Sequence, residues 1–128
     1  ERLDLLTKMG TVVQYVVLRS DLITRLKWPL GAVIAQACHA CTACLHAFRD
    51  DPYTQEYLTA IDTMHKIVLE IGDEASIEAL SKTLTENNVD HKLWMEQPEE
   101  IPTCIATKPC PKDTIQKYFK KLKLFKGM

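Results

Sequence analysis

Two polar side chains with distinct chemistry stand three residues apart in the otherwise small and apolar stretch of residues 31–40. They are the amide Gln36 and the imidazole His39, and most of their neighbours are alanine, cysteine or valine. On an α-helix, residues at i and i+3 share a face, so this spacing places the two side chains side by side. An imidazole exchanges protons near neutral pH, and an amide both donates and accepts hydrogen bonds. Such a pair has either partners in a core, the more common case for a histidine on an apolar helix, or a functional role.

Five cysteines raise the question of a metal site or a reactive thiol: Cys38, Cys41, Cys44, Cys104 and Cys110. An odd number, in a chain without a visible signal peptide, suits a reducing compartment. The first three imitate a metal motif, but at about 100° per residue Cys38 and Cys44 lie about 120° apart around a helix. A closed zinc or cluster site also needs a fourth ligand. We predict neither a metal nor another cofactor, and expect small thiols that pack a helix.

A thiol enzyme that uses Cys38 is a further alternative. Cys38 and His39 are adjacent, and adjacent helical residues point about 100° apart. The two side chains therefore do not form a nucleophile–base pair with each other, which disfavours this alternative.

The elements that must position these residues alternate between strand and helix. Residues 11–18 form a β-branched, nearly continuous apolar run, which predicts a central strand buried on both faces. Further strands are expected at residues 66–71, 91–96 and 103–108. Helices are expected at residues 30–49, 52–60, 74–86 and 111–121, with loops at 21–29 and 98–102. Strands alternating with helices imply an α/β fold with at least some parallel pairing.

Composition limits the class of protein. At 128 residues the chain fits a single domain spanning residues 1–128. The 46% of apolar and 26% of charged residues are typical of a globular protein rather than a disordered one. The best candidate for a membrane span, residues 30–48, is interrupted by Gln36, His39 and His46, so no membrane span is expected. The chain starts at Glu1 rather than at methionine, which leaves a removed targeting segment open.

Positive charge is concentrated near the end of the chain. The formal net charge is −1, so nucleic acid would have to bind a local patch. Between Lys108 and Lys126 there are seven lysines and one acidic residue, Asp113, with aromatic and leucine side chains among them. This pattern fits either a solvated amphipathic face or an edge that contacts phosphates.

A series of short motifs adds a resemblance to a known family. The motifs are Val17-Leu-Arg-Ser-Asp-Leu22, residues 31–40 (roughly G-K-V-A-A-Q-x-S-H-A in the family), Lys66-Ile-Val-Leu69, Asp73-Glu74, Ile101-Pro102, Thr103-Cys-Ile-Ala106, Pro109-x-Pro111 and Leu122-Lys-Leu124. In their order and spacing the chain resembles the archaeal and eukaryotic type of peptidyl-tRNA hydrolase, and most closely its divergent branch of peptidyl-tRNA hydrolase domain-containing proteins. The resemblance implies a four-stranded mixed sheet with helices on both faces. It also implies hydrolysis of the ester between a peptide and the terminal ribose of tRNA, with peptidyl-tRNA or another RNA as partner.

The resemblance further implies roles for particular residues. His39 would be the base or an orienting group, Gln36 would donate to a carbonyl or ribose, and Thr103 would bond the substrate. Asp21 matches the family acid after the first strand, with a structural loop role as the alternative. The lysines expected to contact tRNA are Lys27, Lys117, Lys120 and Lys121.

The chain departs from the family pattern where charge is needed. Ala32 stands at the position of the family's active-site lysine, and Lys27 lies nearby in a loop that is longer than usual. The family aspartate aligns with either Glu96 or Met95, and the arginine that follows it is missing. These changes weaken oxyanion stabilisation and the attraction of tRNA.

Two classes of function remain. One is a weak peptidyl-tRNA hydrolase with Glu96 as its carboxylate, and the other is a non-catalytic member of the fold that binds RNA or a protein. We expect a cytoplasmic location, with a mitochondrial one and a homodimer left open.

Overall fold

Strand β1 (Val12–Arg19) lies in the middle of a mixed sheet in the computed structural model, which describes residues 11–127. It pairs in parallel with β2 (Lys66–Ile71) and antiparallel with β4 (Ile101–Thr107). Strand β3 (His91–Glu96) continues the sheet beyond β4. All of β1 after its first residue is buried, so the prediction of a central strand covered on both faces is confirmed.

Two short strands enlarge the sheet beyond the four that were predicted. Strand β5 (Cys110–Pro111) pairs with the start of β1, and β6 (Lys123–Leu124) pairs with β2. The described residues thus form a six-stranded sheet, so the expected number of strands was wrong although the α/β class is right. Each additional strand has two residues, which is too short for an apolar pattern to reveal it.

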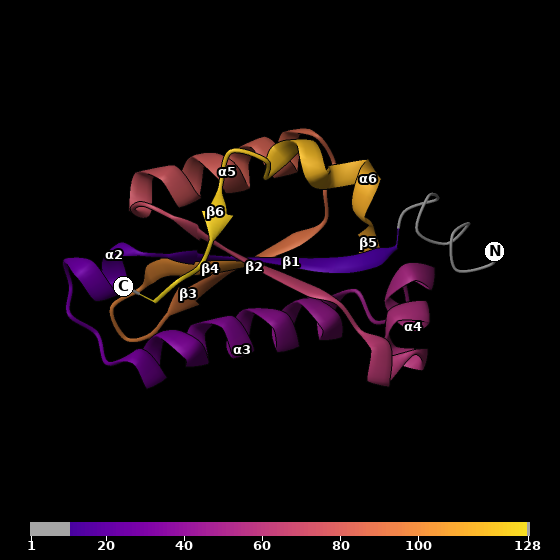
Figure 1. Ribbon diagram of the computed structural model, residues 1–128, viewed down its shortest axis with the longest axis horizontal. Helices are drawn as coiled ribbons and strands as arrows, with labels where there is room; N and C mark the ends of the chain where they lie inside the picture. Colours follow the sequence, from indigo (N-terminus) through magenta and orange to yellow (C-terminus); the bar gives the residue numbers. More distant parts are fainter. Residues whose placement is uncertain (1–10, 128) are drawn as a thin grey trace.

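Helices cover both faces of the sheet (Figure 1). Helices α3 (Leu30–Ala47) and α4 (Pro52–Thr59) lie on one face. Helices α5 (Glu74–Glu86) and α6 (Lys112–Ile115) lie on the other. The 3₁₀ turn η1 (Ile61–Thr63) leads from α4 toward β2. The helices on both faces follow the expectation from the resemblance.

Two expected segments differ from the structure. The expected loop at residues 21–29 begins with a short helix, α2 (Asp21–Thr24). The last helix does not continue to residue 121, because the chain passes into the 3₁₀ turn η2 (Gln116–Tyr118) after Ile115. This tighter turn brings Phe119 into the core, where only 2% of its surface remains exposed.

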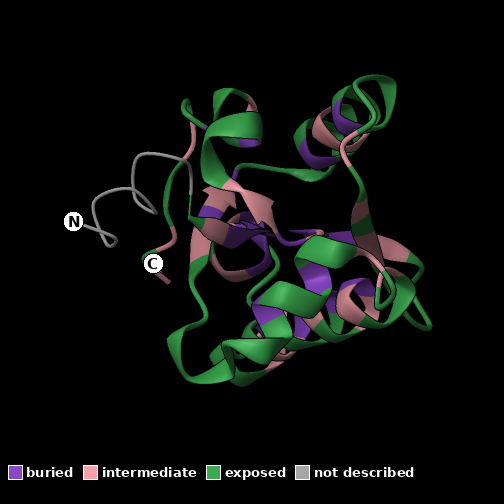
Figure 2. Cartoon of the chain, turned by 90° about the vertical axis from the view of Figure 1, so that its right-hand side faces the viewer, coloured by how far each residue is buried: buried purple, intermediate pink, exposed green. Residues whose placement is uncertain are grey.

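Small side chains line the inner face of α3. Its buried residues recur every three or four positions, as on one face of a helix: Val33, Gln36, Ala40 and Cys44. The apolar three, Val33, Ala40 and Cys44, pack in a cluster with Val16 and Leu18 of β1 and with Cys104 and Ala106 of β4. Figure 2 shows the buried positions gathered along the sheet and on the inner sides of the helices. With little bulk at this contact, α3 can lie close to the sheet.

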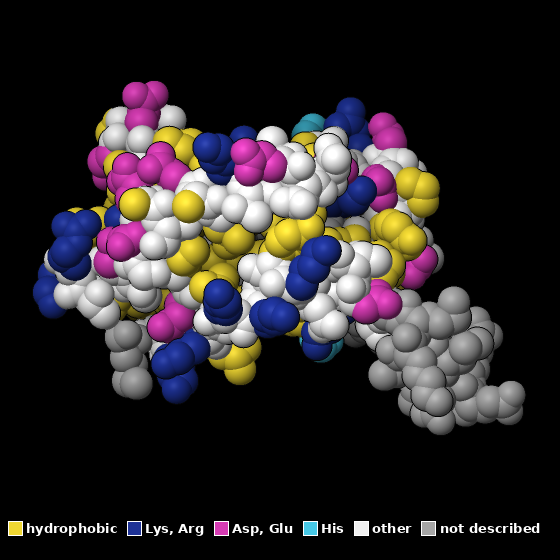
Figure 3. Space-filling model, turned by 90° about the horizontal axis from the view of Figure 1, so that it is seen from above, with side chains coloured by type: hydrophobic (Ala, Val, Ile, Leu, Met, Phe, Trp, Pro, Cys, Tyr) yellow, Lys and Arg dark blue, Asp and Glu magenta, His cyan; other side chains and the backbone are white. Residues whose placement is uncertain are grey.

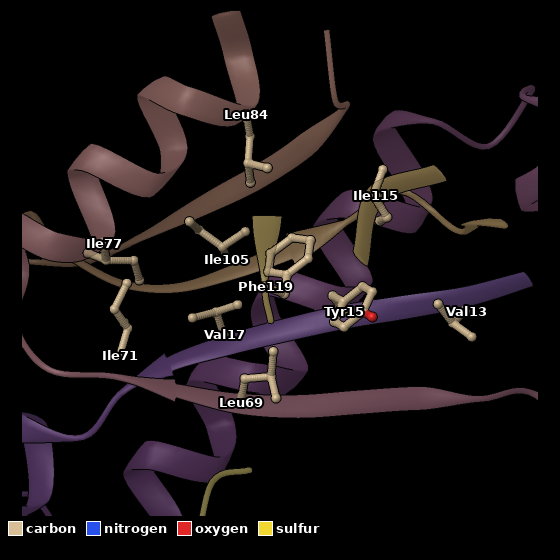
Figure 4. Packing of buried hydrophobic residues seen from close by; sticks show 10 residues of the cluster. All are labelled: Val13, Tyr15, Val17, Leu69, Ile71, Ile77, Leu84, Ile105, Ile115 and Phe119. Carbon is tan, nitrogen blue, oxygen red and sulfur yellow. The ribbon is translucent and has the colours of Figure 1, made fainter. Parts of the chain in front are cut away.

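A second cluster fills the opposite face of the sheet. Figure 4 shows Tyr15 and Val17 of β1 pointing toward Ile77 and Leu84 of α5 and toward Phe119. The rings of Tyr15 and Phe119 stack with their centroids 4.3 Å apart. The side chains of β1 alternate between the two faces of the sheet and therefore contribute to both clusters.

Helix α3 is also long and apolar enough to be tested as a membrane span. Over its 18 residues the mean hydropathy is 1.3, and by length and composition alone it could cross a membrane. The polar residues of this segment thus do not exclude a membrane span by length and composition, and the absence of such a span stays a prediction. In the fold, α3 packs one face against the sheet, and 22% of its residues are buried, Gln36 among them.

Candidate active site

Gln36 and Thr103 form a buried hydrogen-bonded pair between α3 and β4. The Thr103 hydroxyl donates to Oε1 of Gln36 over 2.8 Å, and Nε2 of Gln36 donates to the carbonyl of Ala32 over 3.1 Å. The exposed fraction is 1% for Gln36 and 0% for Thr103. The pair ties the helix to the strand, and neither side chain is open to a substrate in this conformation.

A β-bulge in β4 turns Thr103 toward α3. In the ladder between β3 and β4, Cys104 lies opposite Trp94 and Pro102 lies opposite the next residue of β3, which leaves Thr103 as the additional residue. An extra residue interrupts the alternation of side chains and can re-aim one of them. Without the bulge, Thr103 would share a face with Ile105, which packs in the cluster on the α5 side. The bulge therefore explains how this hydroxyl reaches the helix.

His39 is exposed and rests on the indole ring of Trp94. The ring centroids are 4.9 Å apart and the planes differ by 29°. Nε1 of Trp94 donates to Oε1 of Glu96 over 3.1 Å, which fixes the plane of the indole. The structure thus brings His39 and Glu96 to the same side of the sheet as the pair of Gln36 and Thr103. An accessible imidazole held in this way can accept a proton from a nearby water.

Asp21 has a structural partner in the buried Arg19. Its carboxylate accepts two hydrogen bonds from Arg19, each 2.9 Å long, and Arg25 approaches to 3.4 Å. Arg19 is 1% exposed and also donates to the carbonyl of Pro102 over 3.0 Å. A buried guanidinium requires such partners, because an unpaired charge in a core is strongly destabilising. These contacts support the structural interpretation of Asp21 rather than a role beside His39.

Position 32 supplies no charge to the candidate site. Ala32 is half-buried, and its carbonyl is engaged by Gln36. Lys27 is exposed in the segment that leads into α3 and has a positive φ of 60°. The chemistry that the family lysine would provide therefore has to come from elsewhere or is lost.

The lysines near the end of the chain lie on the other layer. Together with Lys112, Lys117 and Lys120 line a hollow of about 420 Å³ whose floor includes Ile67 and Leu69 of β2. This hollow opens on the α5 and α6 side of the sheet, whereas α3 lies on the opposite side (Figure 1). Lys121 is exposed in the turn after η2. The structure does not bring these predicted tRNA contacts next to His39.

The cysteines on α3 range from exposed to buried. Cys38 is exposed, Cys41 is half-buried and Cys44 is buried. Burial raises the pKa of Cys44 to about 12 and raises the pKa of Cys104 well above that of a free thiol. A thiol that stays protonated is a poor nucleophile and a poor metal ligand. Cys44 and Cys104 therefore act as small packing residues in the cluster beneath α3.

Sequence reasoning missed Trp94 and Arg19. A signal was available for each, because Trp94 stands two residues before Glu96 in an expected strand and so shares its face. Arg19 ends an apolar strand two residues before Asp21, and a cation at that place needs an acidic partner.

Comparisons with known proteins cover almost all of the described region. A family model described as peptidyl-tRNA hydrolase PTH2 matches residues 12–125. Curated relatives from Mus musculus and Homo sapiens both carry the name "Putative peptidyl-tRNA hydrolase PTRHD1". Each is 53% identical over 116 residues, which is 90% of this chain and 83% of the relative. The matched residues include every strand from β1 to β6 and the whole candidate site.

Proposed function

The chain belongs to the peptidyl-tRNA hydrolase PTH2 family, and from this we propose that it hydrolyses the ester between a peptide and the terminal ribose of tRNA. We further propose that its turnover is slow. The observation that carries the proposal is the exposed imidazole of His39, held on Trp94 beside the buried pair of Gln36 and Thr103. An ester hydrolase needs an accessible proton acceptor on a rigid support, and this arrangement offers one.

His39 is the residue proposed to act on the attacking water. In this proposal its imidazole accepts the proton of the attacking water or orients that water toward the ester carbon. Trp94 holds the ring by stacking, and Glu96 fixes Trp94 through the indole N–H. A ring with fewer accessible orientations spends more time in a reactive geometry, which lowers the entropic part of the barrier.

Gln36 and Thr103 are assigned a positioning role. The Thr103 proton is already donated to Gln36, so in this conformation Thr103 could only accept a hydrogen bond from a substrate. Their contribution is to fix the first turns of α3 on β4. The position of His39, one turn further along the same helix, then depends on this contact.

The slow ester hydrolysis that we propose follows from the alanine at position 32. The tetrahedral intermediate of ester hydrolysis carries an oxyanion, and Ala32 has neither a charge nor a side-chain donor for it. The segment Glu96 to Glu100 adds acidic groups to the same end of the domain. The lack of a charged or donor side chain at position 32 also favours a second candidate function, in which the protein binds RNA or a protein partner without cleaving an ester.

Release of peptide from a defined peptidyl-tRNA by the purified protein tests the proposal. We expect slow release by the wild-type chain and loss of release in His39→Ala, with an unchanged melting temperature. His46→Ala is the matched control, because His46 is exposed on the same helix and should be dispensable. Equal activity of His39→Ala and wild type would overturn the assignment of His39. Binding of tRNA without any release by wild type would support the second candidate instead.

A further inference from the structure

The last described residues cross from one layer of the fold to the other. We call residues 122–127 the C-terminal strap. Leu122 packs with the cluster on the α5 side, whereas Phe125 packs with the cluster on the α3 side. Between them β6 pairs with β2, and the Phe125 amide donates to the carbonyl of Val68 over 3.0 Å. The strap therefore passes round the β2 edge of the sheet, as Figure 1 shows.

The strap ends beside the start of α3. A Cβ placed on Gly127 would lie 3.9 Å from Cδ1 of Leu30, the first residue of that helix. His39 follows Leu30 by nine residues, which at the rise of an α-helix corresponds to about 13 Å along the axis. A few unpaired nucleotides can span such a distance. The start of α3 beside the strap and His39 are thus about 13 Å apart along the helix axis, and an RNA with its 3′ end at His39, on the β3 side of the sheet, must cross α3 to reach Lys126.

Exposed lysines occur along the chain from α6 to the end of the strap. The segment 112–126 has six lysines and one acidic residue, although the chain as a whole has a net charge of −1. Lys123 and Lys126 on the strap are both exposed, and neither makes an ion pair within residues 11–127. They continue the positive charge of Lys117, Lys120 and Lys121 from the α6 layer toward α3. Figure 3 shows dark-blue side chains following this edge of the molecule.

We infer that the C-terminal strap is the track along which the acceptor arm of tRNA reaches the candidate site, with Lys123 and Lys126 bound to its phosphates. The inference rests on the proposed function, because it takes RNA as the partner. It assigns an order along the nucleic acid: Lys126 contacts the unpaired 3′ end, and Lys117, Lys120 and Lys121 contact the paired stem. Lysine suits this task, because its ammonium binds phosphate without reading sequence.

The strap also explains how one RNA could contact both Lys117, Lys120 and Lys121 and the distant imidazole of His39. These lysines lie on the layer opposite α3, so a nucleic acid that touches both must turn round an edge of the sheet. The strap supplies this route at the β2 edge. A lysine-rich strap that ended far from α3 would have given no reason to connect the two surfaces.

The test uses an RNA hairpin that copies an acceptor stem and carries no esterified peptide or amino acid, with and without its unpaired 3′ end. Affinity is measured against salt concentration for the wild-type chain, Lys126→Gln and Lys123→Gln/Lys126→Gln. Lys82→Gln is the matched control, since Lys82 is exposed on α5 and lies outside the strap and away from the α3 side of the sheet. We expect the strap double variant to bind several-fold more weakly. Its salt slope should fall by about 0.7–0.9 for each lost contact, and that of the control should not change.

Comparing the two hairpins tests the proposed order of the lysine contacts along the RNA. Lys126→Gln should weaken binding to the hairpin that has the 3′ end and have no effect on the hairpin that lacks it. Equal losses on both hairpins, or no loss on either while wild type binds, would overturn the strap inference and leave the proposed function standing. Failure of wild type to bind either hairpin would overturn both. Restored binding in Lys126→Arg would support a phosphate contact.

Discussion

At the residue scale, the geometry of the candidate site depends on one hydroxyl group. Thr103 is fully buried and donates its only hydroxyl proton to Gln36, whose amide is itself buried. Removing the hydroxyl leaves an amide oxygen without that partner in a region that excludes water. Such an unpaired group is more destabilising than the loss of an average hydrogen bond.

Thr103→Val should lower the free energy of unfolding by about 1–3 kcal/mol, as for other buried acceptors left unpaired. Denaturant unfolding measures the change. Thr54→Val is the control, because the buried hydroxyl of Thr54 has no hydrogen-bond partner within residues 11–127. We expect little change there. Adding Gln36→Leu to Thr103→Val should recover part of the loss, since both partners are then apolar. Equal losses for the two threonine variants would show that the pair contributes nothing.

Sequence spacing predicted only part of this arrangement. Gln36 and His39 were expected side by side, yet the structure buries one and exposes the other. Three residues turn an α-helix by about 300°, so the two side chains still diverge by about 60°. At the boundary between sheet and solvent this angle is enough to separate a buried amide from an exposed imidazole. The bulge that aims Thr103 could not be predicted, because an extra residue in one strand has no mark in the sequence of that strand.

At the scale of elements, one carboxylate joins α4 to the end of β4. Oδ1 of Asp51 accepts from the Tyr53 amide over 2.9 Å and so caps α4. Its other oxygen accepts from Nζ of Lys108 over 2.8 Å, and Lys108 also bonds Asp90 over 3.2 Å. The hydrogen bond from Lys108 is the main reason that the pKa of Asp51 lies below its usual value.

This lowered pKa predicts a pH dependence of stability. A carboxyl group whose pKa is lower in the folded than in the unfolded state stabilises the fold above its usual pKa, near 4. That stabilisation disappears as the pH falls through the folded value. Asp51→Asn keeps a cap but loses the charge, so it should lower the free energy of unfolding by about 0.5–1 kcal/mol at pH 7. The difference from wild type should vanish in strong acid.

Asp50→Asn is the control for this measurement, because Asp50 is the exposed neighbour. It should unfold like wild type at every pH. A difference between Asp51→Asn and wild type that persisted at the same size in strong acid would contradict the assignment to charge.

Elements with a long pattern or a capping residue were predicted well. Strand β2 and helix α5 have the expected limits, and Asp73 caps α5 by accepting from the Ser76 amide over 2.8 Å. The end of the chain was predicted wrongly. There the lysines allow a helix, but burial of Phe119 and pairing of β6 with β2 favour a turn and a strand. Such long-range contacts override local propensity.

At the scale of the whole molecule, the lysine-rich surface and the candidate site lie on different layers. The imidazole of His39 is on the α3 side, and Lys117 and Lys120 are on the α5 and α6 side. A tRNA is much larger than this domain, so it can contact both layers only by following an edge. The low net charge means that such binding depends on a local patch and therefore on salt.

Lys117→Gln/Lys120→Gln/Lys121→Gln should weaken association with tRNA and flatten its salt dependence. If all three contact a duplex, the slope of log affinity against log salt should change by about 2–3, because each contact contributes about 0.9. Titration at several salt concentrations measures it, with Lys82→Gln as reference. An unchanged slope would place the RNA surface elsewhere.

Single-turnover cleavage of peptidyl-tRNA by wild type and Ala32→Lys tests the central claim most directly. The claim is that this chain retains the hydrolase site but lacks the cation that stabilises the oxyanion. It predicts slow release by wild type and a gain of about a hundredfold in Ala32→Lys, the usual effect of one oxyanion donor. Thr42→Lys, which adds the same charge at an exposed position of α3, should give no gain. Fast release by wild type that Ala32→Lys does not improve, or no release by either protein, would contradict the claim.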